Sequence, residues 1–440
     1  MTRSQPWRPV LFWVVALGIG FLLFQFFAGL GTKTRSNSVY VLNNPGGWRT
    51  ALLYLGGLLV LVLVTSFIGK LMGDRARGRP VRYLDVLGDQ LTHVFIWVVL
   101  ILTLYPLVHV IAASTDPNNN LFQIPEFSDA PVLLRSRVIP AFNWDFSNYA
   151  KLFVGINLYW YQWWALALSV ISLLGIMLGA VYNFVTGNNP GRGLRRYRAW
   201  TLRALIVGLA VFFLTLNGSQ FTGGTNESKF LIWVRNSFMV SSITGILAVL
   251  VTTTAGYAMA RLRFPGRFQT LLFFIFVQMF PNFLGLVAIF FLISSLGLLN
   301  TFPGLILAYS GGAIAFGTWI YKGYVESLPH SLEEAALVDG ATRWVAFWRI
   351  VLPLSGPMLV FIFLLQFIGT YTEFILANVL MTGVDQWNVG VGLRSFATQF
   401  TTRWGIFSAA SILGSLPIVA LFYSFQQVFV SGTVAGGVKE

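Results

Sequence analysis

The sequence contains no cysteine, only three histidines and few charged residues. Of its 440 residues, 10% are Asp, Glu, Lys or Arg, whereas soluble domains carry about 25%. Without Cys, the chain can form neither disulfides nor thiolate metal sites. His93 and His109 stand sixteen positions apart, more than four helical turns, so they cannot share one metal ion. A GxxxxGKS or GxxxxGKT run is also absent, so the chain has no P-loop that could hold ATP phosphates.

The sequence is instead rich in apolar residues. Hydrophobic residues make up 56% of the chain, and the mean hydropathy is +0.72. A membrane protein is the only class that fits this composition. The net charge of +14 would suggest nucleic acid if the basic residues formed one patch. They stand at the ends of apolar runs, so we expect a lipid membrane as partner and no nucleic acid.

Ten apolar runs are long enough to be candidate membrane spans, which need about 20 residues. The first is too long for a signal-peptide core, so we interpret it as a retained span. The fold class expected is therefore all-α, a polytopic bundle of about ten transmembrane helices. The runs are 9–30, 50–72, 91–113, 164–185, 201–217, 236–259, 270–293, 303–321, 355–380 and 406–430.

The basic residues predict the orientation of these spans. An even number of spans places both termini on one side of the membrane. If that side is cytoplasmic, 19 of the 29 Lys and Arg residues lie inside and ten lie outside. The positive-inside rule favours this arrangement, with both termini in the cytoplasm.

Residues 331–353 form an island of mixed polarity between two apolar runs. Ser331 and Glu334 have capping-box spacing, which predicts a helix starting at Leu332. Gly340 can end that helix with positive φ. A second amphipathic helix is predicted to follow, with Pro353 in the first turn of the next span. On spacing alone, a cytosolic helical loop without further function stays open. The apolar side of the second helix would comprise Trp344, Phe347, Trp348 and Ile350.

The same stretch resembles the EAA loop of permease subunits in bacterial ABC importers. Glu-Ala-Ala, then Gly after three residues, then Ile-Val-Leu-Pro after nine more, falls at the family spacing. The resemblance implies a coupling helix that docks in a cleft on an ATPase subunit, with Glu334 contacting an ATPase arginine. The ATPase-coupling residues implied are Glu334, Ala335, Ala336, Asp339, Gly340, Ile350, Leu352 and Pro353.

Further features are similar to MalG-type permeases of maltose/maltodextrin importers, over residues 90–157 and 230–440. They are Tyr105-Pro106-Leu107, Asn236-Ser237, Ala255 to Arg261, Asn300-Thr301, Thr372-Glu373 and the tail. The resemblance implies a six-helix core in a bacterial inner membrane. Its partners would be a MalF-type permease, a MalK-type ATPase dimer and a periplasmic sugar-binding protein. ATP and Mg²⁺ would bind to the ATPase, and this subunit would bind no cofactor. The tail residues implied to reach the ATPases are Gly436, Gly437, Val438 and Lys439.

The chain departs from that family in its number of spans, ten against six. We expect an extra hairpin at 1–88, the first core helix and a long periplasmic loop at 89–157, an inserted hairpin at 158–230, and the permease core at 231–440. The inserted hairpin interrupts the outer region, which puts the family's contacts with the binding protein in doubt. Its outer end carries an aromatic cluster (Tyr159, Trp160, Tyr161, Trp163 and Trp164), interpreted as an interfacial belt rather than a sugar-stacking platform.

Glu373 is the only acidic residue within a predicted span, seven residues after Gln366 on one helix face. A buried carboxylate is costly, so it should face protein or a wet cavity. A structural hydrogen bond and a role in a cavity or gate both stay open for Glu373.

The function predicted is the permease subunit of an ATP-driven sugar importer, for maltose/maltodextrin or a related oligosaccharide such as trehalose. It is a transport subunit and not an enzyme, because ATP hydrolysis would occur on a separate polypeptide. A same-family permease for glycerol phosphate or an amino sugar is the nearest alternative. An ion-coupled secondary transporter is a further one, but Glu373 alone gives it little support.

Overall fold

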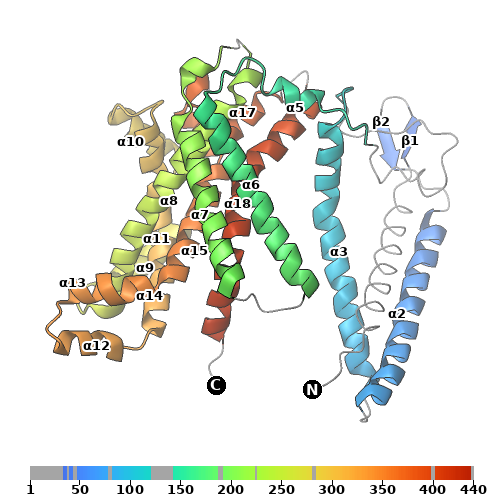
Figure 1. Cartoon of the computed structure of the whole chain (residues 1–440), viewed down its shortest axis with the longest axis horizontal. Coiled ribbons are helices and arrows are strands. Elements are labelled where there is room, and N and C mark those ends of the chain that lie inside the picture. The colour runs from blue at the N-terminus through green and yellow to red at the C-terminus, as the bar shows by residue number, and fades with distance from the viewer. Residues whose placement is uncertain are drawn as a thin grey trace. The chain divides into compact units, whose positions relative to one another are not determined.

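The computed structural model describes residues 33–36, 39–42, 47–77, 82–119, 142–186, 192–222, 225–279, 284–397 and 402–437. The predicted run 9–30 lies outside these residues. Each of the other nine runs is helical over most of its length (Figure 1). The chain forms two compact units, residues 1–148 with 404–409, and residues 149–403 with 410–440.

The described residues of the first unit include two long helices and a small hairpin. Helix α2 (Gly47–Arg77) packs on α3 (Tyr83–Ser114), where Leu58 and Val62 are buried against α3 residues such as Val94. Helix α3 continues through Pro106. An antiparallel pair of short strands, β1 (Lys33–Ser36) and β2 (Val39–Leu42), is the sheet found within the described residues.

The second unit holds most of the described helices. Short helix α5 (Ser147–Lys151) stands where the two units meet in the sequence, and α18 (Trp404–Gly437) begins in the first unit and continues in the second. The others are α6 (Trp160–Thr186), α7 (Arg192–Thr215), α8 (Phe230–Arg261), α9 (Arg267–Met279), α10 (Leu286–Ser295), α11 (Phe302–Ser327), α12 (Ser331–Val338), α13 (Arg343–Ala346), α14 (Leu352–Leu354), α15 (Gly356–Thr372), α16 (Ile375–Leu380) and α17 (Val389–Arg394).

Helix α8 is the central helix of this unit, and it packs against both α11 and α15. Glycines allow the close approach to α11. A Cβ at Gly317 would lie 2.5 Å from Thr252 Cγ2, and one at Gly256 would lie 2.9 Å from the Tyr321 ring. Small residues at these two positions therefore permit close contact between the helices.

The N-terminal part of α8 is fixed by polar side chains. Trp233 is fully buried and donates from Nε1 to the carbonyl of Val384 at 2.8 Å. Asn236 donates to the carbonyls of Asp385 and Trp387. These bonds hold the loop before α17 against α8, at the end of the unit opposite α12 (Figure 1).

The residues predicted as an inserted hairpin contain α6 and α7, which pack against each other. A pair of buried amides joins them near one end. Gln162 Nε2 donates to Gln220 Oε1 at 3.2 Å, and Gln220 Nε2 donates to Gln162 Oε1 at 2.7 Å. Each carboxamide also bonds to backbone groups, so the pair joins the start of α6 to the turn that follows α7 without leaving buried polar atoms unpaired.

Four described helices are long and apolar enough to cross a membrane, and two bent pairs raise the number to six. Other predicted spans are shorter than expected, such as Leu55–Leu71 and Trp200–Thr215. The predicted run 270–293 is divided into α9 and α10, and the run 355–380 is divided at Glu373. The second division arises because Glu373 has extended backbone angles (φ −67°, ψ 134°) and ends α15.

Candidate coupling site

Residues 331–354, here called the arm, lie at one end of the second unit (Figure 1). Helix α12 ends in a Schellman motif, as Gly340 predicted. Gly340 has φ +84°, its amide donates to the carbonyl of Leu337, and the amide of Ala341 donates to that of Ala336 at 2.9 Å. This hydrogen-bond pair stops the helix after two turns and turns the chain into α13.

The predicted capping box at the start of α12 is wrong. Ser331 is already helical, and the N-cap is His330, which has α-helical angles and makes no side-chain cap. The carbonyl of His330 accepts from the amides of Glu333 and Glu334. The helix therefore starts one residue early, because contacts with α8 rather than a local cap set its register.

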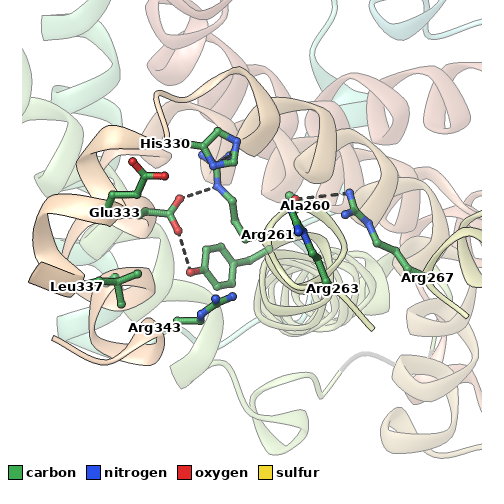
Figure 2. A pocket seen from close by; sticks show the side chains of 11 residues that line it. Ala260, Arg261, Arg263, Arg267, His330, Glu333, Leu337 and Arg343 are labelled. Carbon is green, nitrogen blue, oxygen red and sulfur yellow. Dashed lines mark hydrogen bonds and ion pairs between the residues drawn. The ribbon is translucent and has the colours of Figure 1, made fainter. Parts of the chain in front are cut away.

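Those contacts centre on Glu333, which the sequence analysis did not select. Its carboxylate accepts from Arg261 Nε at 2.6 Å and from the Tyr257 hydroxyl at 2.9 Å (Figure 2). Only 4% of the Arg261 side chain and 11% of the Glu333 side chain are exposed. The ion pair is therefore shielded from solvent, and it joins α12 directly to the last turn of α8.

Arg261 extends this connection to the chain before α12. Its Nη2 donates to the carbonyl of Leu328 at 2.9 Å, and its Nη1 lies 2.6 Å from His330 Nε2. One guanidinium thus bonds to the end of α11, the N-cap of α12 and Glu333. Two features of the sequence could have indicated this contact: a second Glu beside Glu334, and a Tyr-x-x-x-Arg pattern at the end of α8. The sequence does not show that these residues meet.

The opposite face of α12 is open to solvent. Glu334 and Ala335 are exposed, and the Val338 side chain is 87% exposed. Ala336 and Asp339 of the predicted set lie beside them, partly and fully exposed. Helix α12 is therefore fixed on one side through Glu333 and exposed on the other.

A basic cavity of about 550 Å³ adjoins α12 (Figure 2). Arg263, Arg267 and Arg343 line it together with Glu334 and Leu337. Arg267 forms an ion pair with Glu326, whereas within the described residues no carboxylate pairs with Arg263 or Arg343. The cavity therefore presents positive charge beside the exposed face of α12.

The second half of the arm differs from the predicted amphipathic helix. Helix α13 is capped by Thr342, whose hydroxyl accepts from the amide of Val345, and passes through a π-helical turn (Phe347–Val351) into α14. Phe347 is buried, but Trp344 and Trp348 are 62% and 42% exposed. The rings of Trp344, Phe347 and Trp348 nevertheless contact one another, with centroids 5.6–5.8 Å apart, so these three residues share one face as predicted. The π turn shifts the face on which later residues lie.

Pro353 was expected in the first turn of the next span, but it lies in α14, at the end of the arm. The next span starts at Gly356, and Pro357 takes the first-turn position. Between them the chain bends by 76° at Ser355. This serine is fully buried, and its Oγ receives a hydrogen bond of 3.1 Å from Tyr321. Ile350 and Leu352 lie partly buried beside the bend.

Glu373 caps a short helix. Its Oε1 accepts from the amide of Leu376 at 2.8 Å, and its Oε2 accepts from the amide of Ala377 and from the Tyr309 hydroxyl at 2.6 Å. These bonds favour the structural interpretation for Glu373, yet the residue also lines a second cavity.

Of the tail residues, Gly436 and Gly437 end α18, and Val438 and Lys439 lie outside the described residues. No group of metal-ligating side chains occurs in the described parts of the chain.

Residues 252–434, which include the whole arm, match the family of binding-protein-dependent transport system inner membrane components. The maltose/maltodextrin transport system permease protein MalG of Salmonella typhimurium strain LT2 is 44% identical over 215 residues, 48% of this chain and 72% of MalG. This chain belongs to that family. MalG of Escherichia coli strain K12 is 43% identical with the same coverage.

Similarity to a solved structure agrees with the fold. A bacterial ABC transporter involved in the import of the acidic polysaccharide alginate covers 79% of this chain at a TM-score of 0.52 and 17% identity. The predictions of a permease fold and a MalG-type resemblance are confirmed. Family membership makes this chain a multi-pass inner-membrane permease component of an ABC importer, a transport subunit whose partner classes are another permease, an ATPase and a binding protein.

Proposed function

We propose that this permease imports a sugar, maltose/maltodextrin or a related oligosaccharide such as trehalose, and that the arm couples it to ATP hydrolysis on another polypeptide. MalG-type relatives support the sugar. The observation that carries the coupling role is the two-sided character of α12. One side is fixed to α8 through Glu333 and Arg261, and the other exposes Glu334, Ala335 and Val338.

The partners proposed are a MalF-type permease, two MalK-type ATPases and a periplasmic sugar-binding protein. The ATPases would bind ATP and Mg²⁺ and grip the exposed face of α12. The basic cavity with Arg263 and Arg343 suits acidic side chains on that partner. The docked face would be cytoplasmic, in line with both termini inside and with the charge distribution. The tail residues Gly436 to Lys439 stay a predicted second contact with the ATPases.

The mechanism proposed is alternating access. Closure of the ATPases would displace α12, and the Arg261–Glu333 pair would carry that displacement into α8. The buried bend at Ser355 would carry it into α15. Because α8 packs on both α11 and α15, movement at the arm would change the separation of these three helices. The sugar would then enter from the binding protein.

The test is ATPase stimulation by loaded binding protein in the purified importer. Glu334→Ala removes the exposed carboxylate and keeps a good helix former. Gly340→Pro forces φ near −65° where the structure has +84° and deletes an amide donor. Stimulation is expected to collapse in both variants while the complex still assembles. Glu326→Ala, an exposed Glu outside the arm, serves as the control.

A panel of sugars completes the test. Maltose, maltotriose, trehalose, glycerol phosphate and an amino sugar are each supplied with the binding protein. Stimulation by glycerol phosphate alone would replace the sugar proposal with the nearest alternative. Wild-type stimulation in both arm variants would refute the coupling role of α12.

A further inference from the structure

The second cavity, of about 370 Å³, lies among the middle portions of three spanning helices of one unit. It is lined by Ala248 near the middle of α8, by Gly312 and Phe316 near the middle of α11, and by Gln366 on α15. Its volume is at the lower end of the range for small-molecule sites, about 300–1,000 Å³. Transport sites in membrane proteins commonly lie near the bilayer midplane.

Small residues create this space. A Cβ added at Gly312 or Gly369 would meet no atom within 4 Å, so both positions border open volume rather than packed neighbours. At Gly317, by contrast, an added Cβ would collide with Thr252. The glycines of α11 therefore serve two different purposes, close packing at one position and an open cavity at the other.

The polar groups of the cavity are few, and only some have bonding capacity left. Glu373 already receives three hydrogen bonds, from Tyr309, Leu376 and Ala377, of about four that a carboxylate can accept. Thr370 donates to the backbone of its own helix. The carboxamide of Gln366 is half-buried and makes no hydrogen bond with any described residue, so both its donor and acceptor atoms are available.

Phe316 supplies an aromatic surface in the same cavity. Its side chain is 47% exposed although it lies within a spanning helix. The other lining side chains include Leu365, Ile362 and Ile320, which are apolar. An aromatic ring beside one amide with two donors and two acceptors suits a sugar, because the ring packs on the C–H face and the amide bonds to hydroxyls.

We propose that Gln366 and Phe316 form a sugar subsite on this chain, in the transport pathway. Glu373 would lie at one end of this subsite and accept a hydrogen bond from a sugar hydroxyl. This inference rests on the proposed sugar import. A cation is the less suitable ligand, because the Glu373 carboxylate is already compensated by two backbone amides and the Tyr309 hydroxyl. The subsite would hold one sugar ring, and the rest of an oligosaccharide would extend towards the partner permease.

The experiment measures binding of radiolabelled maltose and maltotriose by equilibrium dialysis. The full importer is used with ATP bound, an ATPase subunit that cannot hydrolyse it, and no binding protein. Gln366→Leu removes the amide at nearly constant volume and is expected to weaken binding by about tenfold, the loss of one buried hydrogen bond. Phe316→Leu is expected to weaken binding, whereas Phe316→Trp, which keeps a ring, retains it.

The matched control is Gln278→Leu, the same substitution on α9, which does not line the cavity. It should bind maltose as the wild type does. If Gln366→Leu does not assemble, the comparison of Phe316→Leu with Phe316→Trp decides the question alone. Wild-type affinity in both Gln366→Leu and Phe316→Leu would overturn the subsite. Failure of the wild type to bind or respond to any sugar would instead refute the proposed function.

Discussion

Replacement of Glu333 tests whether the arm and α8 move as one body. Glu333→Ala leaves the Arg261 guanidinium, of which 4% is exposed, without its carboxylate. Removal of one partner of a buried ion pair costs about 3–5 kcal/mol. Helix α12 has only two turns, and the helix propensities of its residues differ by a few tenths of a kcal/mol each, so they cannot compensate for this loss. We therefore expect α12 to detach locally from α8 while the rest of the unit stays folded.

Two measurements follow from this expectation. Hydrogen exchange should show faster exchange of the α12 amides and little change in the middle of α8. ATPase activity should lose its dependence on loaded binding protein. The charge-swapped pair Arg261→Glu with Glu333→Arg should recover part of both, because it restores an ion pair at the same place. Glu326→Ala is the control, since that Glu is 41% exposed and its ion pairs contribute about 1 kcal/mol or less.

The opposite result would exclude this role of the Arg261–Glu333 ion pair. If Glu333→Ala keeps both the α12 protection and the ligand-dependent ATPase of the wild type, the ion pair does not hold the arm. A uniform loss of protection across the second unit would point to global destabilisation instead. The distribution of exchange along the chain separates these outcomes, because local detachment speeds exchange in α12 alone whereas general unfolding speeds it in every helix of the unit.

Three further substitutions probe the packing that supports the arm and the cavity. Gly317→Val should destabilise the fold by about 1–3 kcal/mol through overpacking against Thr252, seen as a lower thermal unfolding midpoint, while Gly323→Ala, with open space around its Cβ, should not. Gln220→Leu should cost about 1–3 kcal/mol by leaving the fully buried Gln162 amide short of a partner, and adding Gln162→Leu should cost less than the sum, as a double-mutant cycle would show. Tyr309→Phe should cost about 1.5–3 kcal/mol, the loss of a hydrogen bond to a charged group, and equal stability of this variant would contradict the bond to Glu373.

The features that could be predicted from the sequence are those that depend on a local pattern of residues. Apolar runs predicted the helices, and Gly340 predicted the end of α12, because only the chain's own periodicity and backbone freedom are involved. The family spacing located the arm. The role of Glu333 could not be predicted, because it depends on a contact with Arg261, which stands 72 positions earlier. No local signal distinguishes Glu333 from Glu334.

The other errors share that cause. The expected capping box failed because His330 contacts Arg261 and shifts the start of α12. The division at Glu373 was missed because a carboxylate within an apolar run does not reveal that it will cap the following helix. Tertiary contacts contribute in two of these places, between His330 and Arg261 and between Glu373 and Tyr309, and a single sequence does not show which distant residues will meet.

The 76° bend at Ser355 determines the direction in which a displacement is transmitted. Because α14 and α15 meet at a steep angle, a movement of α14 along its own axis would shift the start of α15 sideways rather than along the α15 axis. A pull along α13 and α14 would therefore tilt α15 as a whole. Gln366 is ten residues from that base, about 15 Å along the helix, so a small shift at the arm would reach the cavity as a change of its width rather than its depth.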